Sequence, residues 1–294
     1  MKKRGIVLGI LLIAFSFSGM NAQVLSDKTM GALGKGVSGF TFSDADAAAL
    51  AKEAVVELDA NNPVAGPEDG YSIRLNRLFA KHVSSEGVNL KYKVYLVKDI
   101  NAFACADGSV RVFAGLMNIM DDNELLAVIG HEIGHVVNHD TRDAIKAAYK
   151  KEALLDAASS QSGKIETLTG SQLGKIGSAM IDSKHSRKQE SQADTFSYDF
   201  MKKNGYDVNA VESAFRILQN LSEGAESSFM TKMMSSHPDS GKRADGAKKR
   251  ATKDGLYKAY IQQKIDNTAP VKVKTTTTTT TTKTTAKKAT AKKK

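Results

Sequence analysis

An amphipathic pattern runs from Asp122 to Asn138. Apolar residues recur in it at the three- and four-residue spacing of an α-helix, at Leu125, Val128, Ile129 and Val136. Asp121 comes directly before this segment and Glu124 lies three residues later, which is the arrangement of a capping box. The pattern therefore predicts one helix over 122–138, with an apolar stripe that faces the core.

Two short runs typical of β-strands precede that helix, at 94–97 and 110–113. The second run follows an Asp107-Gly108 pair, which favours a tight turn, so residues 103–113 are predicted to form a hairpin. Helical patterns dominate the chain after residue 121. Together they predict an α+β fold that is mainly helical, with a small sheet beside the 122–138 helix.

Two further helical patterns rich in small residues lie at 144–158 and 168–180. A Ser/Gly stretch at 159–163 separates them. Two interpretations stay open for this region. It is either a plain helical hairpin or a lid that moves over a cleft.

The 122–138 helix carries the motif His131-Glu132-Ile133-Gly134-His135. Residues i and i+4 share one helix face, so the nitrogens of His131 and His135 can converge on one metal ion. Both lie about a quarter turn from the apolar stripe, so they are expected to face a cleft. Glu132 lies beside them, where it can accept a proton from a water molecule that the metal activates. The motif predicts metal-dependent peptide hydrolysis; the alternative is two incidental histidines on a core helix.

A catalytic zinc site has three protein ligands and one open position, so one ligand must come from elsewhere. His139 would lie about 12 Å from His131 along the helix axis, which is too far for one ion. The metzincin pattern needs a histidine and a glycine where this chain has Thr141 and Asn138. Cys105 is the only cysteine and precedes a predicted turn, which is more typical of a small buried residue than of a ligand.

A better candidate lies in the helical pattern around residues 189–200, where Ala193, Phe196 and Phe200 share one side. Glu190 and Asp194 are i and i+4 neighbours on a single face. Glu190 can ligate zinc, and Asp194 can accept the outer N–H of a zinc histidine. Alone, this pair would suit an acidic solvated face. With the histidine motif upstream, it matches the glutamate-zincin arrangement.

Several segments support a resemblance to a known family. They are, in chain order, residues 92–99, 101–104 and 111–117, the Ser191-Gln192-Ala193-Asp194 sequence, and His237-Pro238. Over about residues 40–250 the chain resembles the HtpX, Oma and BepA group of zinc metallopeptidases, and most closely its LoiP-like periplasmic members. The resemblance implies a gluzincin metallopeptidase domain.

The resemblance also implies roles for individual residues. One zinc ion per chain would be bound by His131, His135 and Glu190. Glu132 would be the general base and acid, and Asp194 would support a zinc ligand from outside the coordination sphere.

A loop histidine in such relatives reaches back to the metal or to the developing oxyanion, and His237 matches it. Arg243, six residues on, favours this assignment. The alternative is a simple helix start with Pro238 as its first residue. Similar chains also present an edge strand beside the metal, where a substrate peptide can pair with little sequence preference. The alternative is an ordinary small sheet that covers the helical core.

The N-terminal 22 residues have the pattern of a secretory signal peptide, with basic residues before a mostly apolar run from Ile6 to Phe17. That run is shorter than the roughly 20 residues that span a membrane. LoiP-like relatives include lipoproteins, whose anchor requires a cysteine just after the signal region, and this chain has none there. We expect export to the periplasm, with membrane association or secretion left open.

Residues 23–266 are expected to form the metallopeptidase domain, and the Thr/Lys-rich residues 267–294 a disordered tail. The net charge is +10; without the +3 of residues 1–22 and the +8 of residues 267–294, −1 remains. This distribution argues against a specific nucleic-acid partner. The tail suits only weak contact with anionic lipid, envelope polymer or nucleic acid.

Three hypotheses follow. The leading one is a zinc endopeptidase of the cell envelope that cleaves misfolded or damaged proteins, with unfolded polypeptides as substrates. The alternative is a metal-containing periplasmic chaperone or assembly factor whose proteolysis is latched or vestigial. The third is a structural envelope protein with a noncatalytic metal. The sequence leaves the natural substrate, the cleavage preference and the oligomeric state open.

Overall fold

The computed structural model describes residues 43–159, 168–224 and 236–268. The predicted signal peptide, most of the Ser/Gly stretch and the tail from residue 269 lie outside the described residues. Within them the fold is α+β and mainly helical, as predicted.

A three-stranded sheet lies at the centre of the fold, with β3 (Lys91–Tyr95), β4 (Ala102–Ala104) and β5 (Ser109–Phe113) in the order β3-β5-β4. β4 and β5 are antiparallel, which confirms the predicted hairpin, and β3 runs parallel to β5. The strand predicted at 94–97 instead begins at Lys91 and ends at Tyr95. Gly108 in the hairpin turn has φ +81°, and an added Cβ would lie 1.9 Å from the carbonyl oxygen of Asn89. Only glycine fits that turn.

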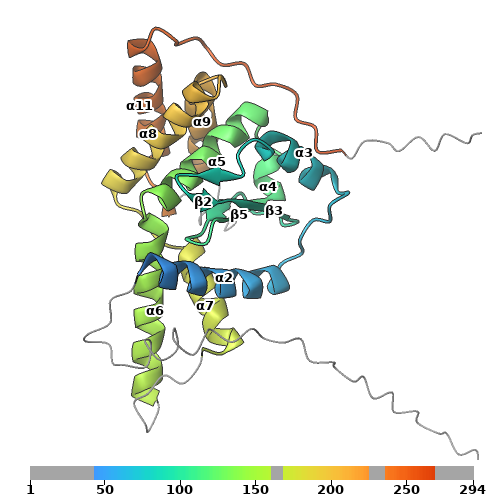
Figure 1. The fold of residues 1–294 in the computed structure, drawn as a ribbon. Helices are drawn as coiled ribbons and strands as arrows, with labels where there is room; N and C mark the ends of the chain where they lie inside the picture. The colour runs from blue at the N-terminus through green and yellow to red at the C-terminus, as the bar shows by residue number, and fades with distance from the viewer. Residues whose placement is uncertain (1–42, 160–167, 225–235, 269–294) are drawn as a thin grey trace, which may run out of the picture.

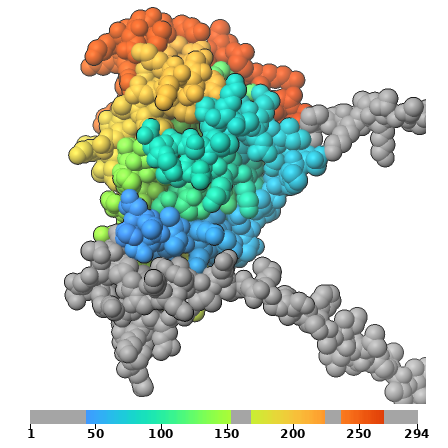
Figure 2. All heavy atoms as spheres, in the orientation of Figure 1, coloured from blue at the N-terminus to red at the C-terminus, as the bar shows by residue number. Residues whose placement is uncertain are grey.

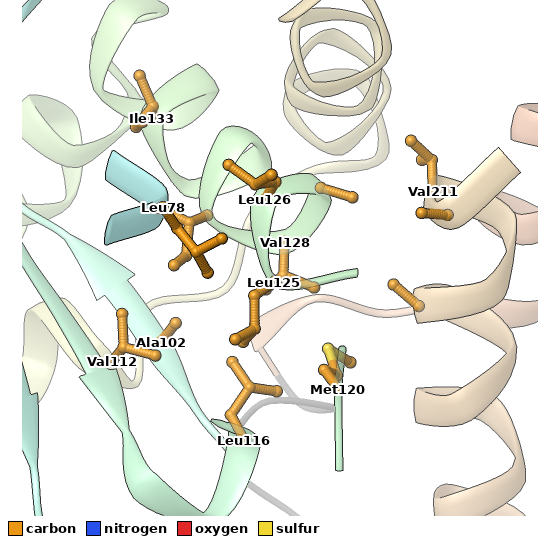
Figure 3. Packing of buried hydrophobic residues seen from close by; sticks show 14 of the residues in the cluster. Leu78, Ala102, Val112, Leu116, Met120, Leu125, Leu126, Val128, Ile133 and Val211 are labelled. Atoms are coloured by element: carbon orange, nitrogen blue, oxygen red, sulfur yellow. The ribbon is translucent and has the colours of Figure 1, made fainter. Parts of the chain in front are cut away.

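The predicted central helix is α5 (Asp122–Val137), and its capping box is present. The Glu124 amide donates to Asp121 Oδ1 (3.0 Å), and the Asp121 amide donates to Glu124 Oε2 (2.9 Å). Figure 3 shows Leu125, Leu126 and Val128 of α5 packed between the sheet and α9 (Asn209–Gly224). Burial of these side chains fixes the helix against the sheet.

α8 (Arg187–Lys203) packs along a different side of α5, and α9 packs with α11 (Ser240–Lys253). Figure 1 shows α8, α9 and α11 gathered at one end of the molecule. α5 can approach α8 closely because Gly134 faces it: a Cβ at Gly134 would lie 3.0 Å from Ala193 Cα. The close approach brings Glu190 to the histidines of α5.

A second group of helices covers the other face of the sheet: α2 (Asp44–Asn61), α6 (Asp140–Ser159) and α7 (Gly170–Ile181). α6 and α7 pack against each other and against α2. This agrees with the helical-hairpin interpretation of the two small-residue helices. The remaining elements are α3 (Gly70–Phe79), α4 (Ala114–Met117), and a two-stranded sheet of β1 (Ser84–Ser85) and β2 (Val88–Asn89).

After α11 the chain crosses the molecule as an extended segment, residues 256–268, to the start of α5 (Figure 1). Tyr260 Oη donates to Asp121 Oδ2 (2.7 Å), so this segment reinforces the capping box. Asn267, the first residue of the predicted tail, donates to the carbonyl of Met117 (3.1 Å). No helix in the described ranges combines the length and hydropathy that crossing a bilayer requires.

Candidate metal centre

Three donor side chains from two helices converge on one point. The Nε2 atoms of His131 and His135 on α5 lie 3.0 Å apart. The Glu190 carboxylate, from the first turn of α8, lies 3.4 Å from His135 Nε2 and 3.5 Å from His131 Nε2. Two imidazole nitrogens and a carboxylate aimed at a common point are the donor set of a divalent metal.

The three donor side chains are buried and one oxygen of Glu190 lacks a hydrogen bond in the described part of the chain, which supports the same assignment. Glu190 and the two histidines are nearly inaccessible to solvent. Within the described residues, Glu190 Oε2 has no aligned hydrogen-bond donor, although Arg243 Nη1 lies 2.9 Å away as an ion pair. Arg243 supplies one positive charge here, but no aligned hydrogen bond among the described residues uses the remaining acceptor capacity of this buried oxygen, and a metal ion shared with the two histidines would use it. The residues present therefore fit a metal ion.

The protonation states are also close to those that a metal needs. Burial, together with the charge of Arg243, lowers the pKa of His131 far below its usual value, so this imidazole is neutral. Burial opposes ionisation of Glu190, but hydrogen bonds from two histidines hold its pKa below the usual range. Burial also opposes protonation of His135, but hydrogen bonds to Asp140 and Glu190 raise its pKa to about 9. A metal would displace one proton from His135.

Each histidine is oriented by a carboxylate on its outer nitrogen. His131 Nδ1 lies 2.9 Å from Asp194 Oδ1, where the resemblance placed this aspartate. His135 Nδ1 lies 2.8 Å from Asp140 Oδ2. In both rings an Nδ1–H that donates to the carboxylate leaves Nε2 free for the metal.

Arg243 links the outer carboxylate to the ligands. Its guanidinium donates to Asp194 Oδ1 (2.7 Å) and lies against the His131 ring, with Nη2 3.0 Å from both ring nitrogens. The guanidinium also lies over the Phe215 ring, with Cζ 4.0 Å from the ring centroid. With Glu190 beside it as well, this buried cation balances two carboxylates.

His237 reaches the same point from the loop before α11. Its Nδ1 lies 2.9 Å from Glu190 Oε1 and 3.3 Å from His131 Nε2. The alternative, in which Pro238 begins a helix, is wrong, because α11 begins at Ser240 with Asp239 as its N-cap. His237 therefore lies within the donor cluster.

Glu132 lies on the side of the donor cluster that faces β4. Its Oε1 is 3.7 Å from His237 Nε2 and has no hydrogen-bond partner within the described residues. Burial raises the pKa of this carboxyl. A carboxyl whose pKa is raised toward neutrality suits proton transfer.

The cavity beside Glu132 is small, about 20 Å³, which is the size that holds about one water molecule. Ala102, Ala104 and Cys105 line it together with Ser183, His185 and His237. His135 lines this cavity and both α5 histidines are buried, so the cleft expected beside them is narrow in this conformation. The segment before α8 and the His237 loop lie against them, since His185 stacks on His135 and His237 Nδ1 lies 3.3 Å from His131 Nε2. In Figure 2 the yellow to orange surface of α8, α9 and α11 lies at the top of the molecule, above the blue surface of α2.

Three residues near the centre were not predicted as functional: Asp140, His185 and, as a contact of the ligands, Arg243. Asp140 is placed by the turn after α5, where His139 adopts φ +63° and changes the direction of the chain. His185 stacks on His135, with 3.8 Å between ring centroids. Only Arg243 had a sequence signal, its fixed distance from His237.

The two rejected ligand candidates are not in the donor cluster. The His139 side chain is mostly exposed, with Nδ1 3.6 Å from Asp44 Oδ2. Cys105 is buried, as expected of a small core residue, and burial raises the pKa of its thiol.

Comparison with known proteins agrees with this site. Residues 73–251 match Peptidase family M48. The chain is 38% identical to Metalloprotease YcaL of Escherichia coli (strain K12) over 255 residues, which cover 85% of this chain and 98% of that protein. It is 35% identical to Metalloprotease LoiP of the same organism over 252 residues, 84% and 98% of the two chains.

A more distant match extends the comparison. A putative beta-barrel assembly-enhancing protease of Vibrio cholerae is 29% identical over 184 residues, which cover 57% of this chain and 36% of that protein. The chain therefore belongs to peptidase family M48, as a LoiP-like metalloprotease whose substrates are polypeptides.

Proposed function

We propose that this protein is a zinc endopeptidase of the cell envelope that cleaves misfolded or damaged polypeptides. The observation that carries the proposal is the convergence of His131, His135 and Glu190 beside Glu132, whose Oε1 has no hydrogen-bond partner within the described residues. Mixed imidazole and carboxylate donors with a neighbouring acid suit zinc hydrolases.

Different residues of the chain would bind the metal, orient its ligands and transfer the proton. His131, His135 and Glu190 would hold the ion, and Asp194 and Asp140 would fix the two imidazoles. When bound, zinc polarises the scissile carbonyl and acidifies water. Glu132 would take the proton of the attacking water and pass it to the leaving amine.

His237 would stabilise the oxyanion that forms during hydrolysis. In the closed conformation it lies among the donors, so it must leave for a substrate to enter. From the same loop its imidazole can donate to the oxygen on which negative charge develops. Such a donor contributes a few kcal/mol to catalysis (~3).

The outer edge of β4, which pairs with no other strand within the described residues, suits an extended polypeptide once the site opens. The Phe113 amide donates to the Asn101 carbonyl (3.0 Å), and the Cys105 amide donates to the Ser109 carbonyl (2.8 Å). Asn101 and Cys105 therefore pair with β5. Because antiparallel residues alternate, the backbone groups of Ala102 and Ala104 point toward the opposite edge. There the Ala102 amide donates to Asn101 Oδ1 (2.9 Å), a bond that a substrate strand would have to replace. A substrate strand that paired there would be held by its backbone, so unfolded chains of many sequences would bind.

A second candidate function is supported by the closed site. A cavity of about 20 Å³ admits no peptide strand. A metal-containing chaperone or assembly factor whose proteolysis is latched by His237 would look the same in this conformation. The two functions differ in whether client folding survives loss of Glu132.

Location in the periplasm rests on the predicted signal peptide alone. Cell fractionation with a cytoplasmic and a periplasmic marker would test it, and enrichment with the cytoplasmic marker would reject it.

Cleavage of casein by the purified protein tests the enzymatic proposal. A chelator should abolish cleavage, and added zinc should restore it. Unchanged cleavage in the chelator would reject a metal mechanism. Restoration by another divalent ion but not by zinc would reject the choice of metal. No cleavage with about one zinc bound per chain would favour the latched chaperone.

A further inference from the structure

The segment between α7 and α8, residues 182–186, borders the cavity beside Glu132 together with β4. It is short and has a defined start and end. Asp182 is the C-cap of α7, and Ser186 is the N-cap of α8 with a complete capping box. Ser183 and His185 from this segment line the cavity beside Glu132.

His185 makes two contacts that extend beyond its own segment. Its ring stacks on His135 at an interplanar angle of 17°, with centroids 3.8 Å apart. Its backbone amide donates to the carbonyl of Ser236 (3.2 Å), directly before His237. The His185 and His237 rings are also near each other, 5.2 Å between centroids.

These contacts join two stretches of chain that are about fifty residues apart. We propose that residues 182–186 and 236–238 form one closing unit over the site, and that His185 is the positioning residue that joins them. A substrate that displaced His237 would break the bond from His185 to Ser236, so both segments open together. This inference rests on the proposed function, and it adds how access of substrate to the site is controlled.

Cys105 provides a readout that needs no proteolysis. It is the only cysteine of the chain, its side chain is 1% exposed, and it lines the cavity that the closing unit covers. A thiol reagent can therefore reach Cys105 only through a motion that exposes it, and loss of the closing unit would make such a motion more frequent. The labelling rate reports closure even if the protein cleaves nothing, so failure of this inference and failure of the proposed function are distinguishable.

The first experiment measures labelling of Cys105 by a small maleimide, with and without chelator so that metal loss is not mistaken for opening. His185→Ala removes a stacked ring and should raise the rate about five- to tenfold. His185→Phe keeps a stacked ring and should stay within about twofold of the parent chain. Lys184→Ala, an exposed neighbour, is the matched control and should change nothing.

The second experiment measures hydrogen exchange and tests whether the segments are coupled. In His237→Ala, amides of residues 182–186 should exchange several-fold faster than in the parent chain. This measurement stands even if His185→Ala does not fold. The closing unit would be overturned if Cys105 were labelled equally fast in His185→Ala and Lys184→Ala. It would also be overturned if the amides of residues 182–186 exchanged at the same rate in His237→Ala as in the parent chain.

Discussion

The carboxylate of Asp140 lies 2.8 Å from Nδ1 of His135, although the two residues belong to different helices. Its other oxygen accepts a hydrogen bond from Gln189 Nε2 (2.9 Å), in the first turn of α8. Asp140 therefore ties one metal-binding histidine to the helix that supplies the carboxylate ligand. An acid in this position fixes the tautomer of His135 and makes its Nε2 more basic.

Asp140→Asn should weaken metal binding by about 10- to 100-fold, because the outer hydrogen bond to His135 loses its charge. Competition with a chromophoric chelator measures the affinity. Asp143→Asn, an exposed aspartate on the same helix, is the control and should bind metal like the parent chain. Equal affinities for the two variants would show that Asp140 does not support His135.

The close contact between α5 and α8 gives a prediction about stability. In Gly134→Ala the new Cβ would lie 3.0 Å from Ala193 Cα and 3.2 Å from its carbonyl oxygen, and this backbone cannot shift alone. We expect a loss of about 1–2 kcal/mol in the free energy of unfolding, with weaker metal binding because α8 carries Glu190.

Gly246→Ala is the matched control for that substitution. Gly246 lies inside α11, and an added Cβ would have no neighbour within 4 Å. The free energy of unfolding should rise by about 0.5–1 kcal/mol, because alanine favours the helix. Chemical denaturation of both variants checks the pair, and effects of the same sign would contradict the packing argument.

A partly buried ion pair between Asp59 and Arg111 predicts acid sensitivity. Burial opposes ionisation of Asp59, but hydrogen bonds from Arg111, Lys93 and Tyr95 lower its pKa to about 2. Because the folded-state pKa lies below the unfolded value of 3.8, this stabilisation is complete above about pH 4 and is lost as the pH falls toward 2.

Asp59→Asn should therefore lose about 2 kcal/mol at pH 7, and the difference from the parent chain should shrink between pH 4 and pH 2. Denaturation curves at several pH values measure this. Asp44→Asn, at an exposed position of the same helix, should change stability little. A constant difference across the acid range would argue that Asp59 has an ordinary pKa.

The elements that sequence could predict are those specified by local patterns. The capping box and apolar spacing set α5, the Asp107-Gly108 turn sets the hairpin, and the acidic pair on α8 marks the third donor. Asp140 could not be predicted in this way, because its position depends on the left-handed conformation of His139, which a single sequence does not specify.

The sequence also did not indicate that other segments cover the site. Helical periodicity separates an apolar stripe from a polar face, but it does not show whether another segment covers the polar face. Here His185 and His237 do so from outside α5. Their positions depend on tertiary contacts between stretches far apart in the chain.

The central claim is that Glu132 performs the chemistry at a metal held by other residues. Metal content and casein cleavage of Glu132→Gln, beside the exposed control Glu223→Gln, test it most directly. We predict about one metal ion per chain in both variants and a loss of cleavage of at least about 100-fold in Glu132→Gln alone. Undiminished cleavage by metal-loaded Glu132→Gln would contradict the account.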